Sequence, residues 1–107
     1  MIKYGLDRVD EMKFASFQPT IEKRDDMWID IELTVTLSPD TPVPDDLIDF
    51  SILVICAANG HIAQMVPLDE GCDCEYQFTP AEKDQLRQYI ESPDIQDRIR
   101  DAVLATR

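Results

Sequence analysis

Residues 28–37 alternate strictly between apolar and polar side chains, and no other feature constrains the fold of this chain as strongly. The apolar positions are Ile29, Ile31, Leu33, Val35 and Leu37, and the polar positions between them are Asp30, Glu32, Thr34 and Thr36. Successive side chains of a β-strand point to opposite faces of its sheet. The pattern therefore predicts a strand with one buried face and one face in water.

Further strands are predicted on both sides of this segment. Residues 50–58 are apolar and rich in β-branched side chains, which is typical of a central strand. Asn59-Gly60 then favours a two-residue type I′ hairpin into residues 61–67. A second turn at Asp69–Gly71 leads into residues 72–78, which alternate again. Residues 12–17 are a candidate strand, residues 19–26 a polar connection, and the proline-rich, acidic residues 38–49 a loop.

Two helices are expected at the C-terminal end. Thr79-Pro80-Ala81-Glu82 has the pattern of an N-cap with a capping box, and the helix that it opens extends to about Ile90. Ser92-Pro93-Asp94 opens a second helix with an apolar face. Strands followed by helices predict one α+β domain over residues 1–107, with an antiparallel sheet of four or five strands and two C-terminal helices packed on one face.

The predicted turns also fix which side chains share a face. A two-residue hairpin places Ala58 opposite His61, Cys56 opposite Ala63 and Val54 opposite Met65, and a four-residue loop at 68–71 then places Met65 opposite Cys74. The face that carries the helices would hold Val54, Cys56, Ala58, Ala63, Met65, Cys74, Tyr76 and Phe78. The opposite face would combine an apolar strip (Leu53, Ile55, Ile62, Val66) with the carboxylates of Asp30, Glu32, Asp73 and Glu75. Either the N-terminal segment, a second subunit or another protein would cover that strip.

The charge of the chain is concentrated in its middle. Ten Lys and Arg against 22 Asp and Glu give a net charge of −12, yet residues 27–78 contain ten acids and neither Lys nor Arg, while both ends are nearly balanced. This sign disfavours direct binding to nucleic acid or to an anionic membrane. No stretch approaches the roughly 18 apolar residues of a membrane span. The acidic segment is either a solvated surface or a surface for a basic partner.

The residue types that support catalysis or metal binding are sparse. Cys56, Cys72, Cys74 and His61 would formally make a zinc site, but their spacing lacks the usual pair of nearby ligands, and the predicted register places Cys56 and Cys74 two strands apart. His61 is the sole candidate base for a cysteine nucleophile. We therefore predict no catalytic residue, metal or cofactor. Three cysteines and no visible leader favour a reducing, cytoplasmic setting.

These observations favour a small, non-enzymatic binding protein, such as an inhibitor or an immunity or anti-defence protein, that covers a basic, nucleic-acid-binding surface of a partner protein. The predicted acidic contacts are Asp30, Glu32, Asp45, Asp46, Asp49, Asp73 and Glu75, and the predicted apolar anchors are Leu53, Ile55 and Ile62. Trp28 is either a further anchor or a plug at the edge of the core. The alternatives are a homodimer formed through the sheet face and a Cys/His metal-binding protein.

Overall fold

The computed structural model describes residues 1–3, 11–41, 47–74 and 76–104. Its elements are β1 (Ile2–Lys3), β2 (Phe14–Lys23), β3 (Trp28–Leu37), β4 (Phe50–Ala57), β5 (Ile62–Asp69), β6 (Cys72–Asp73), β7 (Tyr76–Gln77), α1 (Pro80–Ile90) and α2 (Pro93–Leu104). The fold is α+β, as the order of the patterns predicted. Neither of these helices has the length and apolar character needed to cross a membrane.

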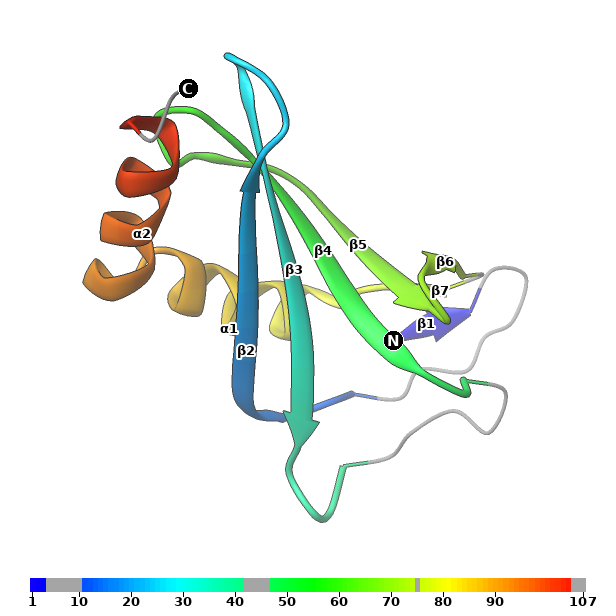
Figure 1. Cartoon of the computed structure of the whole chain (residues 1–107). Coiled ribbons are helices and arrows are strands. Elements are labelled where there is room, and N and C mark those ends of the chain that lie inside the picture. Colours follow the sequence, from blue (N-terminus) through cyan, green and yellow to red (C-terminus); the bar gives the residue numbers. More distant parts are fainter. Residues whose placement is uncertain (4–10, 42–46, 75, 105–107) are drawn as a thin grey trace.

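An antiparallel sheet in the order β2-β3-β4-β5-β6 forms the body of the molecule, and β1 pairs separately with β7. In Figure 1, α1 crosses behind the strands and α2 stands beside β2. The helices contact β2, β3 and β5. We call the sheet face that they cover the helix face and the opposite one the outer face.

The core lies between the helix face and the helices. The strands contribute Ile29, Ile31, Leu33, Ile52, Val54 and Cys56, and the helices contribute Leu86, Ile90, Ile95 and Ile99, all of them at most 1% exposed. The strand residues occupy every second position of β3 and β4, so the alternation in residues 28–37 is confirmed. Burial of these side chains is the main stabilising term, at roughly 1.5–3 kcal/mol for each large aliphatic group.

The N-terminal strand is longer than the sequence predicted. β2 runs from Phe14 to Lys23, so most of the segment read as a polar connection is strand, and Ile21 pairs with Ile31 of β3. Pro19 is compatible with β2 because β2 is an edge strand, in which the N–H groups that face away from β3 make no ladder bond. Phe17 lies on the helix face with its ring centroid 4.5 Å from that of Tyr89. β2 thus extends the sheet and does not cover the outer face.

The first hairpin corrects the predicted register. Val54 does pair with Met65, but a bulge after Ile55 places Cys56 opposite Ile62, where Ala63 was expected. The Gly60 N–H donates to the Ala57 carbonyl at 2.9 Å, the Ala57 N–H donates to the His61 carbonyl at 2.8 Å, and Gly60 has φ +92°. This is a three-residue loop that ends in a left-handed glycine, one residue longer than the predicted type I′ turn. The extra residue turns Ile62 to the helix face.

The second turn is shorter than predicted. Asp69 pairs with Cys72, so the turn consists of Glu70 and Gly71 alone, both at positive φ, in place of a four-residue loop at 68–71. Met65 therefore does not pair with Cys74, nor Ala63 with Tyr76, nor His61 with Phe78. β6 ends at Asp73, and Tyr76 joins β7, which pairs with β1. The local alternation of residues 72–78 could not reveal that the segment divides between two sheets.

The first turn of α1 fastens the N-terminal segment to the helix. Thr79 and Glu82 form the predicted capping box, and Glu82 is 0% exposed. Its Oε2 accepts hydrogen bonds from the backbone nitrogen of Met12 at 2.8 Å and from the amino nitrogen of Met1 at 2.6 Å. Gln85 continues the contact, because its amide donates to the Met12 carbonyl and accepts from the Phe14 N–H. The glutamate of the capping box, Glu82, therefore also fixes the segment that leads into β2.

Candidate protein interface

The outer face is built from the positions that alternate with the core. Pairing across the strands brings together rows of side chains, which run Glu22-Asp30-Ile55-Gln64, Thr20-Glu32-Leu53-Val66 and Gln18-Thr34-Ser51-Leu68-Asp73. Trp28 pairs with Ala57 at one end of the same face. The helices that the structure describes pack on the opposite side (Figure 1). The outer face is thus a sheet surface with both apolar and acidic side chains.

An apolar strip runs along this face. We define it as Trp28, Ile55, Leu53 and Val66, which lie on β3, β4 and β5 and are all partly exposed. Leu53 and Ile55 are where the sequence predicted them. Ile62 is not, because the bulge in β4–β5 turns it to the helix face, where it packs against the core. Trp28 also belongs to the strip. It lies an even number of residues from Asp30 and Glu32, so the alternation of β3 already placed it on the same face.

The acidic residues predicted on this face differ in their availability. Asp30 is paired with Arg24, whose guanidinium lies 2.6 Å from Oδ1 and 3.0 Å from Oδ2 of the carboxylate. Glu32 is exposed and has no ion-pair partner among the residues that the structure describes. Glu22, which the sequence reasoning did not select, is exposed and pairs across the strands with Asp30. Because Arg24 compensates the charge of Asp30, the negative charge of this face comes mainly from Glu22 and Glu32.

The remaining predicted acids lie towards the far end of the sheet or fall outside the described residues. Asp73 is exposed and pairs with Leu68 on the outer face. Asp49 is exposed just before β4, where the Asp69 carboxylate accepts the N–H groups of Ile48 and Asp49 at 2.9 and 2.8 Å. Asp45, Asp46 and Glu75 lie outside the described residues.

A hollow of about 270 Å³ lies at this end of the outer face. Its lining includes two of the predicted acids, Glu32 and Asp49, together with Thr34, Ser51 and Leu68. Leu68 is 9% exposed but does not belong to the core cluster, which agrees with its place on the outer face. Glu32 and Asp49 therefore line the same hollow, with the Thr34–Ser51 pair between them.

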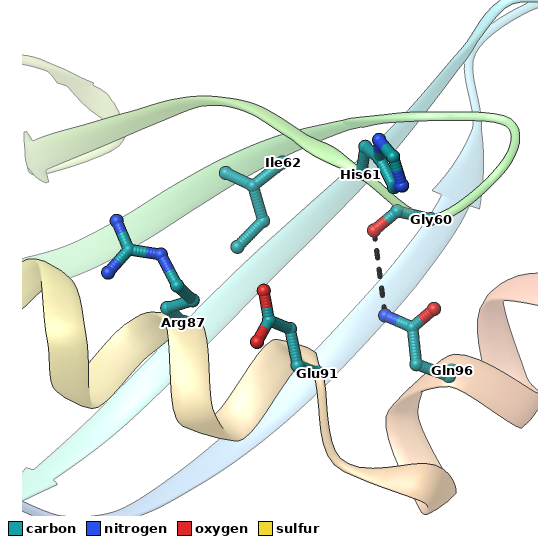
Figure 2. A pocket seen from close by; sticks show the side chains of 6 residues that line it. All are labelled: Gly60, His61, Ile62, Arg87, Glu91 and Gln96. Atoms are coloured by element: carbon teal, nitrogen blue, oxygen red, sulfur yellow. Dashed lines mark hydrogen bonds between the residues drawn. The ribbon is translucent and has the colours of Figure 1, made fainter.

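A second hollow, of about 520 Å³, lies on the helix face (Figure 2). It is lined by Gly60, His61, Ile62, Arg87, Glu91 and Gln96. Arg87 is engaged by Asp84 at 2.6 Å, and the Gln96 amide donates to the Ile90 carbonyl at 2.8 Å and to the Gly60 carbonyl at 3.5 Å. The Gln96 bonds join the first hairpin to both helices, whereas the Arg87–Asp84 pair lies within α1.

The cysteines occupy three different environments. Cys56 is buried in the core, Cys72 is exposed and Cys74 is half-buried, with its thiol donating to the Pro67 carbonyl at 3.4 Å. Burial raises the pKa of the Cys56 thiol to about 11, and burial likewise raises the pKa of Cys74. Within the described ranges, no three His, Cys, Asp or Glu side chains are grouped so as to hold a metal ion.

These environments predict a strong difference in thiol reactivity. Iodoacetamide at pH 8 is expected to label Cys72 rapidly and Cys56 only after unfolding, because the thiolate is the reactive form and burial disfavours it. The unfolded chain releases the Cys56 proton near pH 9.0 whereas the folded chain keeps it until about pH 11, so stability should fall as the pH rises between these values. Peptide mass spectrometry of folded and urea-unfolded samples measures the labelling. Equal labelling of Cys56 and Cys72 in the folded protein would contradict the assignment.

Comparison of the chain with protein families, with curated proteins and with solved structures found no match in any of the three.

Proposed function

We propose that this chain is a non-enzymatic binding protein whose outer face binds a basic protein, in the manner of an inhibitor or an immunity or anti-defence protein that covers a nucleic-acid-binding surface. The observation that carries the proposal is the combination of the apolar strip with the carboxylates of Glu22 and Glu32 on a sheet face opposite the helices. A surface of this kind steers a basic partner through its field and retains it through apolar contact.

The charges on the face favour a basic partner over a second copy of this chain. In a symmetric dimer through the outer face, Glu22 and Glu32 of one copy would approach the same acidic surface of the other, and like charges brought together cost several kcal/mol. A partner rich in Lys or Arg instead gains from the same carboxylates. Trp28 adds a large aromatic anchor, a residue type that is enriched at binding hot spots.

Removal of two charges from the outer face should weaken partner binding, whereas removal of two charges elsewhere should not. We expect Glu22→Gln/Glu32→Gln to slow association with the partner by about tenfold at low salt, because the steering field is reduced. Asp97→Asn/Asp101→Asn on α2 is the matched control, since it changes the net charge equally on exposed helix positions. Affinity capture from the source cell, with identification of the bound proteins, selects the partner, and biolayer interferometry then measures its association rate.

Support requires a partner with a basic surface that the wild type and the α2 variant capture and the outer-face variant captures poorly. The partner should also be released at 0.5 M NaCl, where the Debye length falls to roughly 4 Å and exposed charges are screened. Capture that is equal for all three proteins, or that is insensitive to salt, would refute the proposal. Sedimentation of the free protein tests the alternative of a homodimer. If the protein sediments as a dimer and Leu53→Asp converts it to a monomer, the apolar strip is a self-association surface.

A further inference from the structure

The α-amino group of Met1 is buried against the first turn of α1. Its nitrogen lies 2.6 Å from Oε2 of Glu82, and the side chains of both residues are shielded from water. Glu82 is the third residue of α1 and closes the capping box with Thr79. An ammonium group and a carboxylate that meet away from water attract each other more strongly than an exposed pair, because bulk water does not screen them.

The two charges of this contact depend on each other. The backbone nitrogens of Met12 and Thr79 also donate to the Glu82 carboxylate, at 2.8 Å each, but Met1 brings the positive charge among these donors. The first turn of a helix carries a partial positive charge, which disfavours an ammonium group at this place. The ammonium group of Met1 is therefore held there by the carboxylate of Glu82, and loss of either charge leaves the other buried without its counter-charge.

The same contact fixes the residues that follow the amino group. The Met1 side chain is 1% exposed and belongs to the core cluster. The next residues form β1, in which Ile2 pairs with Gln77 and Lys3 pairs with Tyr76 of β7. Displacement of the amino group would therefore withdraw Met1 from the core and separate β1 from β7.

Acylation of the α-amino group would break this contact. An acyl thioester that reacts with an amine forms an amide and releases its thiol, while the amine loses a proton, so the terminal positive charge is removed. The amide nitrogen keeps one N–H donor and cannot form an ion pair with Glu82. The acyl group also requires space beside the Glu82 carboxylate, which is 0% exposed.

We propose that the α-amino group of Met1 is a modification-sensitive switch that controls the docking of residues 1–3. While the amino group is unacylated, its ion pair with Glu82 holds these residues on α1 and β7. Acylation excludes the terminus from this place and releases β1 and the Met1 side chain from the rest of the fold.

The first test compares the unmodified chain with a chain that is acetylated on Met1 by co-expression with an Nα-acetyltransferase. We expect acetylation to raise the equilibrium constant of urea unfolding by about 100-fold, because it removes one partner of a buried ion pair while Glu82 keeps its backbone donors. Lys83→Gln is the matched control, since it removes one positive charge from the exposed next position on α1, and it should change the constant by less than about twofold.

A second measurement separates loss of the ion pair from simple crowding by the acetyl group. In a Glu82→Gln background the carboxylate is already absent, so acetylation should raise the unfolding constant by less than about fivefold. A single glycine placed before Met1 keeps a charged terminus but moves it by about 3.5 Å, and this extension should cost the wild type as much as acetylation does.

A third measurement uses the wild-type chain alone. An accessible α-amino group is acylated before lysines near neutral pH, because α-amino groups ordinarily lose their proton at lower pH. With an N-hydroxysuccinimide ester at pH 8, Met1 of the folded protein should instead react at least about 20-fold more slowly than the exposed Lys13 and Lys83. In urea, Met1 should react at least as fast as these lysines. Peptide mass spectrometry measures the rates.

Hydrogen exchange then reports whether residues 1–3 are released, because the amides of β1 and β7 should lose protection on acetylation more than those of β3 do. Four results would overturn the switch: an acetylated chain as stable as the unmodified one, an equal loss on acetylation with and without Glu82, unchanged protection of β1 and β7, or acylation of Met1 as fast as that of Lys13 in the folded protein. A terminus at Met1 in the protein purified from the source cell supports the proposal, whereas a chain that continues before Met1 overturns it.

Discussion

Replacement of Glu82 with alanine is expected to lower the free energy of unfolding by about 3–5 kcal/mol, which would be the largest effect of any single substitution considered for this chain. The Glu82 carboxylate is 0% exposed and accepts hydrogen bonds from the backbone nitrogens of Met12 and Thr79, each at 2.8 Å, and from the Met1 amino nitrogen at 2.6 Å. Truncation removes both acceptor oxygens of the carboxylate and leaves these three donors without their partner. Buried donors that lose their partner carry the full cost of desolvation, and the missing side chain leaves a void as well.

Asp84→Ala is the matched control for this prediction. Asp84 lies two residues further along α1, is exposed and pairs with Arg87, so its loss should cost no more than about 0.5 kcal/mol. Glu82→Gln should fall between the two, because the glutamine keeps the shape but replaces one acceptor oxygen with a donor. Urea unfolding followed by circular dichroism gives the three values. A loss for Glu82→Ala no greater than that for Asp84→Ala would show that the buried carboxylate does not hold the N-terminal segment.

Gly60→Ala should be the second most damaging change, at about 2–4 kcal/mol, and Gly71→Ala should cost only about 1–2 kcal/mol. Both glycines have positive φ, +92° and +81°, which an alanine adopts at a cost. They differ in their surroundings. A Cβ on Gly60 would lie 2.4 Å from Oε1 of Gln96, whereas a Cβ on Gly71 would meet nothing within 4 Å.

The clash at Gly60 matters because Gln96 connects the first hairpin to the helices. Its amide donates to the carbonyls of Ile90 and Gly60, as Figure 2 shows for the latter bond, so displacement of the side chain weakens both contacts. Gly60→Ala/Gln96→Ala should recover part of the loss, since the smaller residue removes the clash. Thermal and urea unfolding of the wild type, Gly60→Ala, Gln96→Ala and the double variant completes the double-mutant cycle. Equal destabilisation by Gly60→Ala and Gly71→Ala would mean that backbone strain alone accounts for both.

The acidic surface was in large part visible in the sequence, because it depends on alternation within single strands. Asp30, Glu32, Leu53 and Ile55 were correctly assigned to one face from the parity of their positions. Strand alternation gives the face on which a side chain lies, but it does not give the ion-pair partner of that side chain. Arg24 reaches Asp30 only because the turn between β2 and β3 brings the two together, and the charge of Asp30 is thereby compensated.

Ile62 is a residue whose face the sequence predicted wrongly. Asn59-Gly60 correctly signalled a hairpin, but the same dipeptide fits both a two-residue turn and a three-residue loop with a left-handed glycine. The structure has the longer loop, and one additional residue transfers Ile62 from the outer face to the helix face. The sequence pattern does not distinguish the two loop lengths, yet the one-residue difference in register decides which side chains face a partner.

The sequence by itself determined the class of fold, the alternating strands, both helices with the capping box, and the concentration of acidic residues between positions 27 and 78, because each depends on neighbours within a few residues of the chain. The tertiary structure alone decided the division of residues 72–78 between two sheets, the burial of Glu82 against Met1 and Met12, and the lining of one hollow by both Glu32 and Asp49. These features join segments far apart in the chain, and their positions follow from turn lengths and strand pairing, which short-range patterns leave undetermined.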